Sequence, residues 1–164
     1  MRISVKSVLD QDLGTTDTFP LDVAKDALSE VLKDFEAMSP LSADLEVMKV
    51  DNALVARSIG IEFAVKLICS NCNNSFEQHI SAPATAWRDF YEKVPEEYIG
   101  EELADVFLID RSHAAIDVAE MLRQELVLLF PIKLICEKCK VNELKRGIDK
   151  EAQTPFQNLK DLLK

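Results

Sequence analysis

The chain has 164 residues, of which 48% are apolar and 29% are charged. This composition is typical of one globular domain that buries a core without disulfides, and the low glycine and proline counts exclude collagen-like or low-complexity character. The formal net charge of -10 argues against broad, charge-driven binding to nucleic acid, which needs clustered Lys and Arg. Neither a signal-peptide pattern nor an apolar run of membrane-spanning length is found, so we expect a soluble, cytoplasmic protein.

The N-terminal half is predicted to contain a strand, a helix and a strand meander. Alternating residues at 3–5 suggest a short opening strand. Apolar residues then recur at helical spacing over 21–38, which predicts an amphipathic helix ended by the Ser-Pro pair that follows. Over 41–84 the apolar positions alternate, with a tight turn expected at 51–52. This pattern indicates three antiparallel strands, with the first Cys-x-x-Cys motif at the second turn.

The C-terminal half is predicted to contain a buried strand and a second main helix. Residues 86–104 are aromatic, acidic and irregular, and we expect a long excursion there. A short apolar run at 106–109 predicts a strand, and the apolar spacing over 115–129 predicts a helix stopped by Pro131. A last amphipathic pattern at 155–163 suggests a short terminal helix. The expected architecture is α+β, an antiparallel β meander with two main helices.

All four cysteines stand in two near-copies of one phrase, V-K-L-I-C-S-N-C at 65–72 and I-K-L-I-C-E-K-C at 132–139. Two such turns can supply four thiolates to one tetrahedral metal ion, and zinc suits this donor set because it accepts four thiolates. The shared K-L-I predicts that each pair follows an apolar, strand-like segment. The gap between the pairs is longer than in a simple zinc ribbon, so the fold must bring them together. We therefore predict a zinc-ribbon-like structural Zn²⁺ site that joins the two turns, with the ligands Cys69, Cys72, Cys136 and Cys139.

Other uses of the cysteines remain open. Each pair could form a disulfide, or the site could lack metal, although a cytosolic chain should hold its thiols reduced. Thioredoxin-type catalysis is disfavoured because that motif opens a helix, and neither pair precedes a helical pattern. A catalytic zinc is disfavoured because four thiolates leave no position for water.

No catalytic constellation is evident. His79 could replace a cysteine as a ligand, but a packing or surface role explains both His79 and His113 better. Two isolated histidines make no Ser-His-Asp grouping, and no glycine-rich phosphate loop is present. We therefore expect no enzyme activity and no small-molecule substrate.

Charge is distributed unevenly along the chain. Residues 84–110 carry eight acids against two bases, whereas residues 131–150 carry six bases against three acids. A solvated face is the simpler interpretation of the basic stretch, and a contact patch for an acidic partner is the alternative. Such a patch would include Lys133, Lys138, Lys140, Lys145 and Arg146.

These residues resemble one known family. A first Cys-x-x-Cys at a meander turn, a D-V-F-L-I-D strand, and the helix I-D-V-A-E-M-L-R-Q-E-L-V-L-L-F-P leading to a second pair are similar to the bacterial YceD family. The ending T-P-F-Q-N-L-K-D-L-L resembles the family's short terminal segment. The resemblance covers residues 3–163 and is most specific over 116–139. The chain departs from many members after the second pair, where it continues Lys140-Val141-Asn142-Glu143.

The resemblance implies a single YceD-like domain over residues 1–164, in a cytoplasmic bacterial protein without known catalytic activity. It further implies a role in the accumulation of 23S ribosomal RNA and in large-subunit biogenesis, with the four cysteines as zinc ligands. The partner would be ribosomal RNA or, given the acidic total, a basic ribosomal protein. A redox-responsive zinc protein, in which Cys-x-x-Cys oxidation releases the metal, is the alternative function.

Overall fold

The computed structural model describes residues 1–51, 53–95 and 106–141. Two compact units can be distinguished, one formed by residues 1–67 with 77–131, and one formed by residues 68–76 with the chain from 132 onward. We call them the sheet unit and the cysteine unit, and each is described by itself. The expectation of a single domain over 1–164 stays a prediction.

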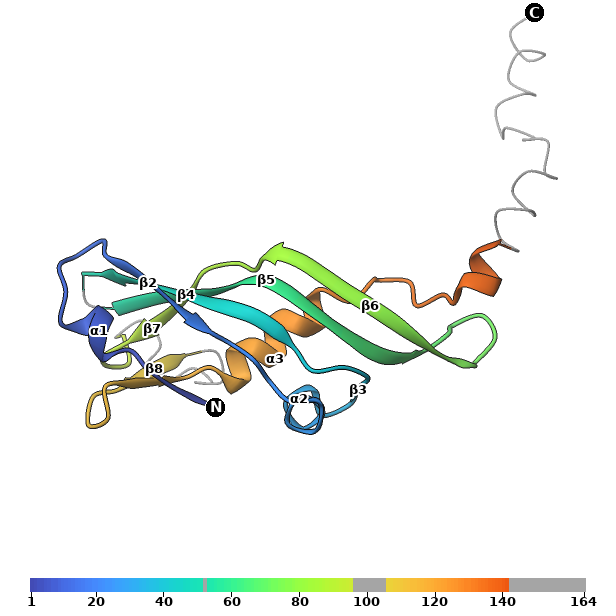
Figure 1. The fold of residues 1–164 in the computed structure, drawn as a ribbon, viewed down its shortest axis with the longest axis horizontal. Helices are drawn as coiled ribbons and strands as arrows, with labels where there is room; N and C mark the ends of the chain where they lie inside the picture. Colours follow the sequence, from blue (N-terminus) through green and yellow to red (C-terminus); the bar gives the residue numbers. More distant parts are fainter. Residues whose placement is uncertain (52, 96–105, 142–164) are drawn as a thin grey trace, which may run out of the picture. The chain divides into compact units, whose positions relative to one another are not determined.

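The described strands form one sheet in the order β1-β9-β8-β7-β5-β4-β2, and β3 and β6 also pair with β5 (Figure 1). The β7–β8 pair is parallel, whereas β1–β9, β9–β8, β7–β5, β5–β4, β4–β2 and β3–β5 are antiparallel. The strands are β1 (Arg2–Ser4), β2 (Thr16–Pro20), β3 (Glu36–Ala37), β4 (Ser42–Val50), β5 (Ala53–Ile68), β6 (Ser75–Ala84), β7 (Arg88–Tyr91), β8 (Phe107–Asp110) and β9 (Ala115–Asp117).

The predicted meander is confirmed as β4, β5 and β6. Strands β4 and β5 are antiparallel, with Leu45 opposite Ser58 and Val47 opposite Ala56. These four side chains are buried, while their neighbours along the strands are half-buried or exposed, which is the period-2 alternation seen in the sequence. The first cysteine pair follows β5, at the second turn, as predicted.

The first predicted helix is shorter than expected. Helix α2 (Lys25–Leu32) ends where Lys33 adopts φ +57°, and the next residues form β3 against β5 instead of continuing the helix. At its other end, Val23 bridges Leu41 in extended conformation. The helix predicted over 21–38 is therefore wrong at both ends, because strand pairing buries those residues as effectively as a helical face does.

Two further expectations need correction. Part of the supposed excursion at 86–104 is β7, which pairs with both β5 and β8 and lies inside the sheet. The second helix, α3 (Ala119–Leu128), starts later than predicted because residues 115–117 form β9 in a hairpin with β8. The strand at 106–109 is confirmed as β8 and the opening strand as β1. The terminal helix predicted at 155–163 lies outside the described residues.

The core of the sheet unit lies between the helices and one face of the sheet. Helices α1 (Lys6–Leu9), α2 and α3 contribute buried Val8, Leu28, Leu32, Leu122 and Leu126, and the strands contribute Leu45, Leu54, Phe63 and Phe90. In Figure 1 the three helices lie on the same side of β2, β4 and β5. The opposite side of these strands is called the open face below. None of the described helices has the length and apolar character of a membrane-spanning helix.

Candidate metal centre

The first cysteine pair sits in a closed turn between β5 and β6. The Cys69 N–H donates to the Asn74 carbonyl at 3.0 Å, and the Asn73 N–H donates to the Cys69 carbonyl at 2.9 Å. Asn73 has φ +55°, a conformation that Asn tolerates better than most residues. The turn buries Cys69 completely and leaves Cys72 exposed.

The second pair sits at the start of a helical segment, which corrects two predictions. The Cys139 and Lys140 N–H groups both donate to the Cys136 carbonyl at 3.0 Å, and residues 137–141 are helical. The preceding K-L-I is not a strand, unlike its counterpart before Cys69. The two near-identical phrases differ because β5 has strand partners on both sides, whereas the second copy follows Pro131 and continues into the good helix formers Glu137 and Lys138.

Two hydrogen bonds donated by backbone N–H groups join the pairs within the cysteine unit. The Ser70 N–H donates to the Leu134 carbonyl at 2.8 Å, and the Cys136 N–H donates to Cys69 Sγ at 3.4 Å. The Cys72 and Cys136 Sγ atoms are 3.8 Å apart, and all four Sγ atoms lie within 4.8 Å of one another. The fold therefore does bring the distant pairs together.

The hydrogen bonds make the four thiols unequal. The Cys136 backbone N–H, with help from the Asn71 and Cys72 amides, lowers the pKa of Cys69 to about 6 against the opposing effect of burial. The contact with Cys136, together with burial, raises the pKa of Cys139 to about 12. The cluster thus stabilises a first thiolate and resists further ones, because the charges repel at this distance. A divalent cation would remove that repulsion.

The donor set fits a tetrahedral thiolate-binding metal. Four thiolates at about 2.3 Å from one ion stand about 3.8 Å from each other, and the cluster approaches this spacing before any adjustment. Zinc and iron both accept four sulfurs in this geometry. The four residues form a candidate metal centre. Four thiolates would fill the tetrahedral coordination sphere and leave no open position for a reacting water.

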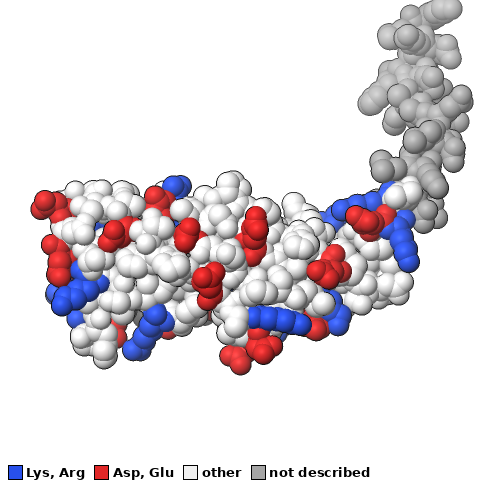
Figure 2. All heavy atoms as spheres, viewed as in Figure 1, with Lys and Arg blue, Asp and Glu red and all other residues white. Residues whose placement is uncertain are grey.

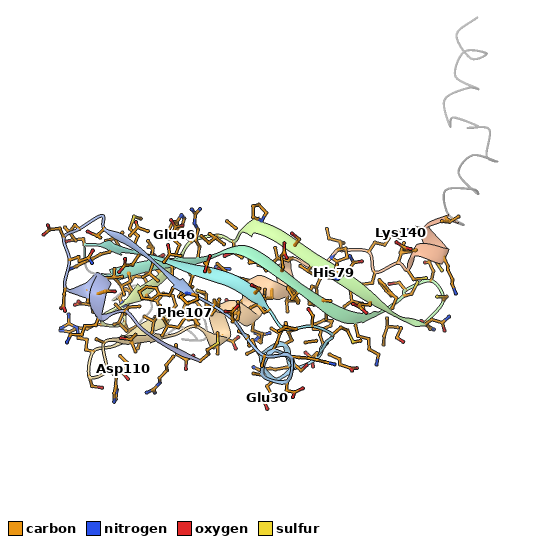
Figure 3. The ribbon with its side chains drawn as sticks, in the orientation of Figure 1. Glu30, Glu46, His79, Phe107, Asp110 and Lys140 are labelled. Atoms are coloured by element: carbon orange, nitrogen blue, oxygen red, sulfur yellow. The ribbon has the colours of Figure 1, made fainter. Side chains whose placement is uncertain are left out.

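The other predicted residues are placed as follows. Lys133, Lys138 and Lys140 are exposed in the cysteine unit, and Figure 3 labels Lys140 on the helical segment 137–141. Figure 2 shows Lys and Arg side chains gathered around this segment. Lys145 and Arg146 lie outside the described residues. His79 is exposed on β6 and is not among the clustered ligands, and the exposed His113 contacts Asp110 at 2.8 Å.

Sequence reasoning missed a buried carboxylate in the sheet unit. Glu125 on α3 is only 3% exposed, and it accepts hydrogen bonds from Thr85 Oγ1 at 2.8 Å and Ser58 Oγ at 3.4 Å. Burial raises its pKa, while the Thr85 hydrogen bond and Arg88, 3.8 Å away, oppose the shift. The available signal was an acidic residue flanked by buried Leu122 and Leu126 on one helix face.

Fold and site define a protein of mixed helices and strands, with a mainly antiparallel sheet and a four-cysteine cluster. The chain belongs to the YceD family, because the family model described as "Large ribosomal RNA subunit accumulation protein YceD" matches residues 58–163, a stretch that contains all four cysteines. That description names an accumulation protein and no catalytic activity. No curated protein and no solved structure matches the chain.

Proposed function

We propose that the protein is a non-enzymatic, cytoplasmic bacterial factor that supports 23S ribosomal RNA accumulation and large-subunit biogenesis. The family description supports this role. Residues 1–164 would act as one YceD-like domain, in which the cysteine unit carries a structural Zn²⁺ and a partner-binding surface.

The Sγ cluster is the observation that carries the zinc proposal. Cys69, Cys72, Cys136 and Cys139 would hold Zn²⁺, which would tie the β5–β6 turn to the segment 132–141. The metal would act by stabilising structure, since saturated thiolate sites are structural rather than catalytic. Within the chain itself, the Cys136 amide orients Cys69 Sγ and the Ser70–Leu134 hydrogen bond aligns the two loops.

The charge of the cysteine unit supports partner binding there. Its described residues carry three bases, Lys133, Lys138 and Lys140, and one acid, Glu137, in a chain with a net charge of -10. Together with Lys145 and Arg146 they would contact ribosomal RNA, and the net charge of -10 makes a basic ribosomal protein the alternative partner.

Metal content per chain, measured by plasma mass spectrometry on tag-free protein purified without chelator, tests the zinc site. We expect one zinc per chain and a loss of order in residues 68–76 and 132–141 on chelation. Well-folded, reduced protein without metal would contradict the site.

Electrophoretic mobility with 23S fragments across a salt series tests the surface. We expect affinity to fall with salt, and K138Q/K140Q to weaken binding and lower the salt slope by about 2. The charge-matched control K6Q/K25Q, in the sheet unit, should leave both unchanged. Affinity that is insensitive to salt would show that these lysines do not contact phosphates.

A redox role is a second candidate function, favoured by the exposure of Cys72 and the lowered pKa of Cys69. Oxidation of two thiols by one peroxide forms a disulfide and two waters, and removes two ligands from the metal. Mild peroxide should then release zinc and increase hydrophobic-dye binding. If peroxide changes neither, the redox role is rejected.

A further inference from the structure

The open face of the sheet unit carries more apolar side chains than a solvated sheet face normally does. The strand register places Met48 of β4 opposite Val55 of β5, and both point away from the core because their neighbours Val47, Leu54 and Ala56 are fully buried. Trp87, just before β7, is 39% exposed, although large aromatic residues usually bury more of their surface. Figure 3 shows Glu46 on this side of the sheet, opposite to Glu30 on α2.

One cation is already bound to the aromatic residue on this face. The Arg57 guanidinium lies 4.4 Å from the centroid of the Trp87 ring, and Arg57 Nε donates to Glu46 Oε2 at 2.6 Å. An indole ring attracts cations through its electron-rich faces, and an adjacent carboxylate reinforces the attraction. On this face, the Trp87 ring and the Glu46 carboxylate together bind the guanidinium of Arg57.

Near Trp87, the remaining charges on the open face are acidic. Asp44 and Asp89 are exposed, and neither has an ion-pair partner among the described residues. Over residues 44–50 and 53–59, Arg57 is the one base on this face, because Lys49 turns to the carbonyls of Leu9 and Gln11. Asp89 is also the first acidic residue of the stretch 84–110. The negative electrostatic potential of these carboxylates repels phosphates and attracts cations.

We propose that the open face around Trp87, Asp89 and Asp44 is a docking surface for an arginine-containing basic polypeptide segment. An arginine of the partner would sit between the Trp87 ring and Asp89, while Met48 and Val55 contact its aliphatic stem. This proposal rests on the proposed function, in which a basic ribosomal protein is one partner, and it names a surface separate from the lysines of the cysteine unit. Charge complementarity favours a basic polypeptide over RNA here.

The experiment uses the intact chain and its own reporter, because Trp87 is the single tryptophan. A nona-arginine peptide is titrated while Trp87 fluorescence is recorded. We expect a saturable change in emission and a dissociation constant that rises about three- to tenfold in D44N/D89N, which keeps side-chain size while removing two carboxylates. The charge-matched control D22N/D26N, in the segment around the start of α2, should bind like the unmodified chain.

Three outcomes would overturn the proposal. The first is no saturable change in emission, and the second is an equal loss of affinity in both double variants, which would indicate attraction by net charge alone. The third is a change produced by single-stranded poly(U) RNA rather than by nona-arginine. None of these outcomes depends on zinc content or on the salt dependence of 23S binding, so failure here is distinguishable from failure of the proposed function.

Discussion

In the sheet unit, apolar side chains from three helices and several strands are buried together, whereas in the described part of the cysteine unit only Cys69 and Ile135 are buried. Apolar burial is the main favourable contribution to folding, at roughly 25 cal/mol per Å². The sheet unit has much apolar burial, and the described part of the cysteine unit has little. Small units of this kind usually depend on a metal or a disulfide. We therefore expect the order of the two units to respond to different perturbations.

The largest expected effect comes from removing one thiolate of the cluster. C69S should lower zinc affinity by more than about a hundredfold, because replacing even residues that support a ligand costs 10- to 100-fold. Without metal, the Ser70 and Cys136 amides should lose protection in hydrogen exchange, while the sheet unit keeps its thermal transition. S70A, in the same turn, is the control and should retain the metal. A collapse of both units in C69S would contradict their separation.

The second largest effect is expected from a cavity in the core of the sheet unit. Phe90 is fully buried, and its ring lies 5.3 Å from that of Phe107. F90A should destabilise the sheet unit by about 3–5 kcal/mol in denaturant unfolding, because it leaves a cavity. The exposed Leu108 supplies the control, and L108A should cost within about 0.5 kcal/mol. Zinc stoichiometry in folded F90A should stay unchanged.

The third effect concerns the buried Glu125. Burial raises its pKa, so the folded state holds the proton more tightly than the unfolded state and ionisation penalises folding. The penalty is absent below the unfolded pKa and grows as pH rises. E125Q should therefore match the unmodified chain near pH 4 and become the more stable of the two towards pH 7, as followed by melting temperature.

Glu120, on the same helix, provides a control of opposite sign. The hydrogen bonds from Arg123 lower its pKa, so its stabilising contribution is present above the unfolded pKa and is lost as pH falls through the folded pKa. E120Q should be less stable than the unmodified chain at pH 7, and the gap should close at low pH. Equal pH profiles for the two variants would refute both assignments.

The smallest expected effect comes from relieving a positive backbone φ angle, tested at one residue in each unit. Ala114, in the β8–β9 turn, and Asn73, in the first cysteine turn, both have positive φ. Because glycine relieves this strain more for Ala than for Asn, A114G should stabilise the sheet unit by about 0.5 kcal/mol. N73G should leave the thermal transition of the sheet unit unchanged. A larger effect of N73G would mean that the two units unfold together.

Several features were predictable because they depend on local patterns. The β4–β5–β6 meander follows from alternation, and β8 follows from a short apolar run. The clustering of the four cysteines was predictable because paired Cys-x-x-Cys motifs are typical of one shared metal site. The length of α2 was not predictable. The apolar residues at 35–38 suit a helix as well as a strand, and only pairing with β5 makes them a strand. The burial of Glu125 was not predictable either, because its hydrogen-bond partners Ser58 and Thr85 are distant in sequence.

The sequence by itself determined the family, the four cysteines of the candidate metal centre and the alternation of the central strands, since each depends on residue type and short-range spacing. Tertiary structure decided which K-L-I segment became a strand, because only the first copy has strands to pair with on both sides. It also decided that Cys69 is buried and Cys72 exposed, and that Arg57 stacks on Trp87. Burial, backbone hydrogen bonds and cross-strand neighbours are long-range properties, and the same local sequence can satisfy more than one of them.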